Sequence, residues 1–193
     1  MKALVLSSPG TLQLSDIELA PLPVGCARVR MHAAALNRRD EWIVRGKYPR
    51  IQYPSVLGAD GCGTVVEINA PDHRLLGQRV VINPNRGWGS DERAQSADYS
   101  ILGMPSPGTF AEYLDVPLDR LHPAPPHLSD DEAAALPVVG MTAYRAVFVQ
   151  GRLVPSDTVL VTGIGGGVAL TALQFAHAAG AEPIAVTSGA EWK

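Results

Sequence analysis

A glycine-rich turn between an apolar strand and an amphipathic helix is the feature that most constrains the fold of this chain. The segment 158–180 reads TVLVTGIGGGVALTALQFAHAAG. It opens with the apolar run Val159–Val161, and from Val168 the apolar residues recur at helical spacing until Gly180 ends the pattern. Residues Glu182–Thr187 then read as a second strand. Strand, glycine turn, helix and strand in this order predict the first βαβ unit of a dinucleotide-binding domain.

The turn itself suits a pyrophosphate group. Glycine accepts a positive φ, which costs another residue about 1–2 kcal/mol, and it lets the backbone come close to a ligand. The helix N-terminus offers unpaired N–H groups and a positive dipole end. The strict G-x-G-x-x-G pattern is not met, because Val168 stands where the third glycine belongs. The alternative is a turn that only packs helix against strand. The predicted cofactor contacts are Gly163, Ile164, Gly165, Gly166, Gly167 and Val168.

The end of the second strand bears on the choice of cofactor. A site for a ribose 2′-hydroxyl needs a carboxylate about 20 residues beyond the glycines. That place holds Thr187, Ser188 and Gly189. A hydroxyl followed by Lys193 suits a 2′-phosphate better, so we predict NADP(H), with Ser188 and Lys193 among the cofactor-binding residues. Glu191 favours NAD instead, and a plain solvated loop is the remaining alternative.

Composition excludes several classes of protein. Hydrophobic residues make up 46% of the 193 residues and charged residues 18%, so a substantial core can form. The net charge of −3 and the lack of a basic run argue against a nucleic-acid partner. No apolar stretch is long enough to span a bilayer, and the N-terminus does not read as a signal peptide. Two cysteines, Cys26 and Cys62, make no disulfide framework. We expect a cytoplasmic protein.

The first 125 residues or so read as mostly β. Short strands alternate with turns rich in glycine, proline and asparagine, which favours a partly open barrel. The predicted strands are Lys2–Leu6, Leu12–Ile17, Ala27–Ala35, Gly61–Ile68, Gln78–Ile82 and Phe110–Val116.

A proline-rich link, Pro123–Pro126, separates this region from a helical one. Ser129 and Glu132 have the spacing of a capping box, which predicts a helix over Asp130–Ala135. We expect Pro137 to break it and a second helix to cover Thr142–Gln150. The predicted domains are therefore 1–127 and 128–193. The chain stops after the second strand of the dinucleotide-binding domain, so we expect a truncated form or a part of a longer protein.

Five segments together resemble the medium-chain dehydrogenase/reductase superfamily, and within it the zinc-independent quinone oxidoreductase-like branch, which is also described as zinc-type alcohol dehydrogenase-like. They occur in the family's order and cover nearly the whole chain. The resemblance implies an α/β fold, with a GroES-like catalytic domain followed by the first part of a Rossmann domain. The segments are ALNRRDEWIVRGKYP (35–49), LGADGCGTVVEI (57–68), GTFAEYLDVP (108–117), SDDEAAALPVVGMTAYRAV (129–147) and VLVTGIGGGVALTALQFA (159–176).

Departures from the family pattern argue against zinc. Zinc-dependent members carry a cysteine where this chain has Asn37, and a Gly-His-Glu sequence where it has Gly58, Ala59 and Asp60. An amide and a methyl group cannot replace those ligands in a catalytic site that needs three of them. The lobe that holds a structural zinc in the family carries four cysteines, whereas residues 83–103 carry none. The five histidines are scattered, so we predict no metal site.

The resemblance also implies which residues lie near the nicotinamide. Asn37 could donate an amide N–H to the cofactor or the substrate oxygen, Tyr48 could donate its O–H, and Trp42 could wall the pocket. Thr142 is expected to contact the nicotinamide side of the cofactor. Structural roles remain open for each: Asn37 as a turn residue, Trp42 as core, Thr142 as a helix N-cap, and the neighbouring Asp40 as a helix cap.

Three functions follow from these residues. The first is an NADPH-dependent, zinc-independent oxidoreductase that transfers hydride to a quinone or an α,β-unsaturated carbonyl compound. The second is a metal-free enzyme of the alcohol dehydrogenase type, and the third is a non-catalytic NAD(P)-binding protein. We expect a homodimer acting on a small carbonyl or quinone substrate. The loop 85–106, which replaces the zinc lobe, is expected to help form that dimer or to frame the substrate cleft.

Overall fold

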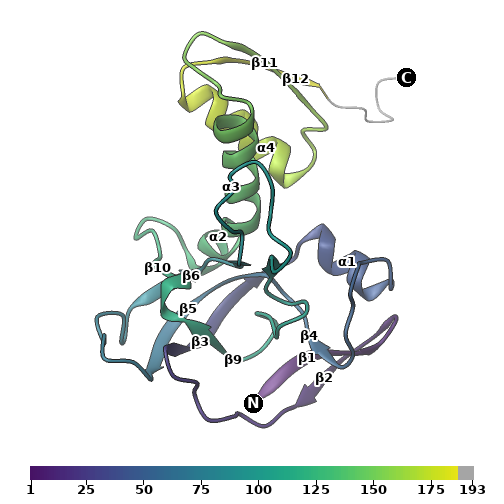
Figure 1. Cartoon of the computed structure of the whole chain (residues 1–193), viewed down its shortest axis with the longest axis vertical. Helices are drawn as coiled ribbons and strands as arrows, with labels where there is room; N and C mark the ends of the chain where they lie inside the picture. Colours follow the sequence, from purple (N-terminus) through teal and green to yellow (C-terminus); the bar gives the residue numbers. More distant parts are fainter. Residues whose placement is uncertain (187–193) are drawn as a thin grey trace. The chain divides into compact units, whose positions relative to one another are not determined.

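The computed structural model describes residues 1–186, which contain two compact units (Figure 1). The division falls between Met1–Pro137 and Val138–Lys193. The predicted boundary at residues 127 and 128 lies before this division, and it stays a prediction. None of the helices in the described part of the chain has the length and apolar character to cross a membrane.

The first unit is built on open antiparallel sheets, as predicted for a GroES-like, partly open barrel (Figure 1). The five-stranded sheet has the order β10-β6-β5-β3-β9, with bounds Leu121–Pro123, Arg79–Ile82, Asp60–Ile68, Cys26–Ala35 and Tyr113–Pro117. The three-stranded sheet has the order β2-β1-β4, with bounds Thr11–Asp16, Lys2–Ser8 and Ser55–Val56. A small hairpin pairs β7 (Asn85–Arg86) with β8 (Ser100–Ile101).

Two apolar clusters hold the first unit together. The larger one lies on the five-stranded sheet and contains Val29, Val65, Val80, Ile82 and Val116, all at most 1% exposed. The smaller one contains Leu6, Ile43, Leu57 and Met104. Each fully buried side chain of this size stabilises the fold by roughly 1.5–3 kcal/mol. The smaller cluster matters for function, because it supports the helix α1 (Arg38–Val44) and the segment after it.

A short helix closes the first unit. Helix α2 (Asp130–Ala134) begins at the predicted cap Ser129, whose backbone N–H donates to Glu132 Oε2 at 2.8 Å. Asp130 then joins the helix to the sheet: it accepts from Arg79 Nε at 2.6 Å and lies 3.0 Å from His32 Nδ1. A 3₁₀ turn, η1 (Leu118–Arg120), lies between β9 and β10.

The second unit contains the predicted βαβ sequence. Strand β11 (Thr158–Thr162) pairs in parallel with β12 (Glu182–Val186), and α4 (Gly167–Ala178) connects them (Figure 1). The right-handed crossover unit of a Rossmann domain has this form.

The helices before β11 agree with the prediction in one respect and differ in another. Pro137 separates two helices, as predicted, because α2 ends at Ala134 and Pro137 begins α3 (Pro137–Tyr144). The first helical position suits proline, since its missing N–H has no partner to lose there. The predicted helix Thr142–Gln150 therefore starts earlier, and its second half, η2 (Arg145–Gln150), is a π-helix.

Candidate functional site

Asn37 and Asp60 meet where α1 and β5 begin. Asn37 Nδ2 donates to Asp60 Oδ2 at 2.9 Å, and Asn37 is the N-cap of α1. The backbone N–H of Asn37 donates to Asp40 Oδ2, also at 2.9 Å, so the alternative role of Asp40 as a helix cap is correct. Asp60 is 1% exposed and Asp40 is 4% exposed. Burial raises the pKa of Asp40, while the Asn37 N–H and the charge of Arg39 oppose that rise.

These residues do not fit a catalytic zinc. At the family's cysteine position, one N–H of the Asn37 amide is already used by Asp60, and an amide nitrogen is no zinc ligand. Ala59 is fully buried and offers only a methyl group. Residues 1–186 contain no group of three histidine, cysteine or acidic side chains arranged to hold a metal ion.

Tyr48 lines a cavity of about 830 Å³ together with the loop that replaces the zinc lobe. Its ring packs against the smaller apolar cluster, and the guanidinium carbon of Arg39 lies 5.2 Å from the ring centroid. The cavity walls are both polar and apolar; besides Tyr48 they include Arg50, Gln95, Ser96, Tyr99, Ile101 and Met104. The loop 85–106 therefore borders the same space as Tyr48, a predicted catalytic residue.

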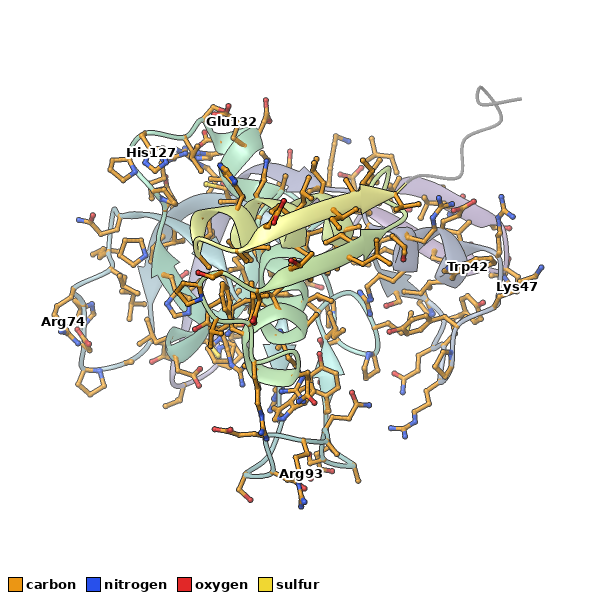
Figure 2. The ribbon with its side chains drawn as sticks, turned by 90° about the horizontal axis from the view of Figure 1, so that it is seen from above. Trp42, Lys47, Arg74, Arg93, His127 and Glu132 are labelled. Carbon is orange, nitrogen blue, oxygen red and sulfur yellow. The ribbon has the colours of Figure 1, made fainter. Side chains whose placement is uncertain are left out.

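Trp42 lies elsewhere on α1. It is 40% exposed, so its alternative role as a core residue does not hold. Its carbonyl accepts from the backbone N–H of Lys47 at 2.8 Å, and Figure 2 shows the two side chains near each other. Trp42 does not line the cavity that Tyr48 lines. The structure thus joins Asn37 to Asp60 and Tyr48 to the loop, but it leaves Trp42 outside that cavity.

The glycine turn of the second unit leaves room at its surface. Gly163 has φ +68°, and its N–H donates to Val186 O at 2.8 Å. Among the atoms of residues 1–186, a Cβ added to Gly163 or Gly165 would meet none within 4 Å, and one added to Gly166 would meet the Gly163 carbonyl oxygen at 3.7 Å. Gly167 differs, because its added Cβ would stand 3.1 Å from Val139. Both a phosphate site and a turn that only packs helix on strand therefore stay open for this segment.

Helix α4 starts at this turn without a side-chain cap. Its N-cap is Gly166, which has no side chain to accept from the N–H groups of the first turn. Ile164 lies within the turn and Val168, 37% exposed, in the first turn of the helix. An uncapped helix N-terminus beside glycines with open space fits the pyrophosphate of a dinucleotide, held by backbone N–H groups.

The remaining cofactor predictions have mixed outcomes. Thr142 lies inside α3 rather than at its start, so the alternative of a helix N-cap is wrong. Its hydroxyl donates to Val138 O at 2.6 Å and keeps its acceptor lone pairs. Ser188 and Lys193 lie outside the described residues, as do Thr187, Gly189 and Glu191.

Two features of the site escaped the sequence analysis. One is the pairing of Asn37 with Asp60, which are 23 positions apart and meet only through the fold. The other is Arg39, whose side chain is 10% exposed and lies over Tyr48. A charged residue followed by Asp40 and Glu41 reads as a solvated helix start, so its burial gave no local signal.

Comparison with known proteins agrees with this architecture. Residues 24–126 match the alcohol dehydrogenase GroES-like domain. The chain belongs to the medium-chain dehydrogenase/reductase superfamily. A zinc-type alcohol dehydrogenase-like protein from Leptosphaeria maculans is 39% identical over 79% of this chain and 46% of its own length. An acryloyl-coenzyme A reductase from Sulfurisphaera tokodaii is 32% identical over 99% of the chain and 60% of its own length.

The fold comparison points the same way. A solved NAD-dependent alcohol dehydrogenase superposes with a TM-score of 0.89 at 36% identity, covering 99% of this chain and 59% of the other. The chain thus spans about half the length of the curated relatives that it matches. The family match and the fold similarity confirm the predicted superfamily and fold. The relatives named here are dehydrogenases or reductases, or resemble them, by name.

Proposed function

We propose that the protein is an NADPH-dependent, zinc-independent oxidoreductase that transfers hydride to a quinone or an α,β-unsaturated carbonyl compound. The observation that carries the proposal is the hydrogen bond between Asn37 and Asp60. Asn37 stands where zinc-dependent members of the superfamily carry a cysteine, and Asp60 stands where they carry the glutamate of Gly-His-Glu. With the Asn37 amide bound to Asp60 and a methyl group at Ala59, we expect hydrogen-bond donors to stabilise the substrate oxygen instead of a metal ion.

This limitation favours one direction of chemistry. Oxidation of a simple alcohol needs an alkoxide, which is costly to form without a Lewis acid. Reduction of a conjugated carbonyl compound is less demanding. A new C–H bond forms at the β-carbon, the C=C electron pair shifts towards the carbonyl, and the oxygen gains negative charge until a solvent proton reaches the α-carbon. A neutral O–H or N–H donor can support that oxygen.

The second unit would hold the cofactor. Backbone N–H groups around Gly163–Val168 would bind the pyrophosphate, and Thr142 would contact the nicotinamide side. A bound nicotinamide nucleotide supplies the hydride. The preference for NADPH rests on the predicted 2′-phosphate contacts of Ser188 and Lys193. The NAD-dependent structural relative makes NADH the nucleotide against which this preference is tested.

The cavity beside Tyr48 would receive the substrate. Its phenol is the candidate donor to the substrate oxygen, and residues 95–101, 104 and 105 of the loop 85–106 line the same cavity. That position supports a role for the loop in framing the cleft, and deletion of Gly87–Ala97 should then change the substrate range. The acryloyl-coenzyme A reductase relative, by its name, acts on a conjugated thioester, which supports the enone class. The homodimer and the cytoplasmic location are part of the same proposal.

The test is a titration of the full-length protein with NADPH and NADH, followed by a screen of quinones, enones and simple alcohols. We expect NADPH to bind at least about tenfold more tightly, which is ~1.4 kcal/mol, and enones or quinones but not alcohols to react. Elemental analysis should find substoichiometric zinc. Activity on alcohols would favour the metal-free alcohol dehydrogenase, and no binding of either nucleotide would refute the proposal. Nucleotide binding without turnover would indicate a non-catalytic binding protein.

A further inference from the structure

Arg39 is a buried cation whose charge faces an aromatic ring. Its side chain is 10% exposed, and its Nη1 donates to the carbonyl oxygen of Leu102 at 2.6 Å. Its Nε and Nη2 are buried, and among residues 1–186 neither has a hydrogen-bond partner. The guanidinium carbon stands 5.2 Å from the centroid of the Tyr48 ring, within the range of a cation–π contact.

An arrangement of this kind needs an explanation, because buried donors without acceptors destabilise a fold. The nearest carboxylate is Asp40, whose Oδ1 lies 3.9 Å from Arg39 Nη1, too far for a hydrogen bond. Asp40 Oδ1 is itself buried without a hydrogen-bond partner among the described residues. The carboxylate compensates the charge of Arg39 but does not satisfy its N–H groups. The π-face of Tyr48 is the remaining electron-rich group in contact with this cation.

The ring that receives this cation is also the one that lines the cavity. Tyr48 packs on the smaller apolar cluster at one side and borders the cavity with Arg50, Asp98 and Tyr99. A cation over a phenol ring draws electron density from it, so the hydroxyl becomes a stronger hydrogen-bond donor. The hydrogen bond from Arg39 Nη1 to the Leu102 carbonyl oxygen also fixes the guanidinium. A guanidinium held in this way restricts the orientation of the Tyr48 ring beneath it.

We propose that Arg39 is a positioning residue that acts through Tyr48: it fixes the ring and strengthens the hydroxyl as a donor to the substrate oxygen. This inference rests on the proposed function, in which Tyr48 supports the charge that develops on that oxygen. The competing role is a structural brace, in which Arg39 only ties α1 to the Leu102 carbonyl.

A double-mutant cycle in the full-length protein separates the two roles. Tyr48→Phe removes the hydroxyl but keeps the ring, and Arg39→Met removes the cation. With an enone and saturating NADPH, we expect each single variant to lower kcat about tenfold. The double variant should be no slower than Tyr48→Phe alone, because without the hydroxyl Arg39 has nothing left to strengthen. KM should change less than kcat, and Arg39→Lys, which keeps the charge, should recover part of the rate.

Two controls guard against a trivial loss of structure. Arg45→Gln removes the same charge from the exposed end of α1, where the side chain is 58% exposed, and should leave kcat unchanged. Arg39→Gln keeps a donor for the Leu102 carbonyl and should behave as Arg39→Met does if the cation is what matters. A full further tenfold loss in the double variant, or rescue by Arg39→Gln alone, would show a brace and overturn the inference. So would an unchanged rate in Tyr48→Phe.

A second measurement does not depend on activity. The ¹³Cζ resonance of Tyr48, assigned with Tyr48→Phe, should move in Arg39→Met and Arg39→Gln and return towards the wild-type position in Arg39→Lys. An unmoved resonance overturns the inference even in an active enzyme. A moved resonance in a protein that reduces none of the carbonyl compounds would instead refute the proposed function and leave the coupling of Arg39 to Tyr48 established.

Discussion

The Asn37–Asp60 pair in the first unit and the glycine turn in the second show two opposite ways of building a polar site. The Asp60 carboxylate is buried, and the half-buried Asn37 amide donates to it at 2.9 Å. The turn around Gly163 and Gly165 leaves space within 4 Å of both glycines unfilled, and its helix starts without a side-chain cap. The pair is closed by the protein itself, whereas the turn leaves space beside Gly163 and Gly165 that the described protein atoms do not fill.

The difference teaches which positions of this superfamily member depend on a ligand. A pair that satisfies its own hydrogen bonds should affect stability when it is changed and should have little to offer a metal ion. Glycines with open space beside them, as at Gly163 and Gly165, should affect ligand binding when substituted and leave stability almost unchanged. The same residue type, glycine, occurs in both kinds of place, so it provides the sharpest test.

Gly108 and Gly165 should respond in opposite ways to the same substitution. A Cβ at Gly108 would stand under 3.0 Å from the carbonyl oxygens of Gly58 and Leu57, so backbone would have to move. We expect Gly108→Ala to lower the free energy of unfolding by about 3 kcal/mol. Gly165→Ala should change it by less than about 0.5 kcal/mol and weaken NADPH binding about tenfold. Urea unfolding and nucleotide titration of the full-length protein measure both.

Gly140→Ala serves as the control for the second half of this pair. Gly140 lies in α3, and its added Cβ also meets nothing within 4 Å. The Gly140→Ala variant should bind NADPH with the affinity of the wild type. If Gly165→Ala binds NADPH as tightly as the wild type does, the turn is not a phosphate site and the contrast fails.

The glycine turn was predictable from sequence because its signal is local. An apolar strand, clustered glycines and a helical period stand next to one another between residues 158 and 180, and the structure has β11, the turn and α4 in that order. The capping box of α2 is local in the same sense. The break between helices at Pro137 was predictable as well, whereas the start of the next helix at Pro137, and not at Thr142, was not.

The Asn37–Asp60 pair could be predicted from sequence only in part. The prediction that it does not hold zinc rests on side-chain chemistry alone and could be made from the residue types. Its hydrogen bond joins residues from α1 and β5, and the burial of Arg39 depends on the Leu102 carbonyl, 63 positions away. No periodicity or spacing reports such contacts. The polar interior of the site therefore had to come from the structure.

Loss of the Asn37–Asp60 hydrogen bond should lower the free energy of unfolding by less than the added Cβ at Gly108 does. Asn37→Ala removes a hydrogen bond to a buried carboxylate, and we expect the free energy of unfolding to fall by about 2 kcal/mol. Asn69→Ala is the matched control, because Asn69 Nδ2 donates at 2.8 Å to a neutral acceptor, Leu22 O. It should cost about 1 kcal/mol. Equal losses at both sites in urea unfolding would mean that the charge of Asp60 adds nothing.

Cys62 lies on β5 two residues after Asp60, and we call this buried part of β5 the closed region. Among the changes considered, those at Cys62 should affect the stability of the native protein at neutral pH the least. Burial raises the pKa of its thiol from 9.0 to about 11, with opposing contributions from Arg79 and Asp130. At pH 8 only about one thiol in a thousand is then a thiolate, the reactive form. A disulfide reagent should therefore modify the partly exposed Cys26 first and reach Cys62 only after unfolding.

The pH dependence of stability tests the same point. The raised pKa favours the neutral thiol in the folded state, so the stabilisation from this group is complete below pH 9 and is lost as the pH rises through about 11. Between these values the free energy of unfolding should fall more steeply in the wild type than in Cys62→Ser, which removes this titration and leaves the others. Parallel curves, or a Cys62 that reacts as fast as Cys26, would mean that solvent reaches the thiol and that the closed region ends before it.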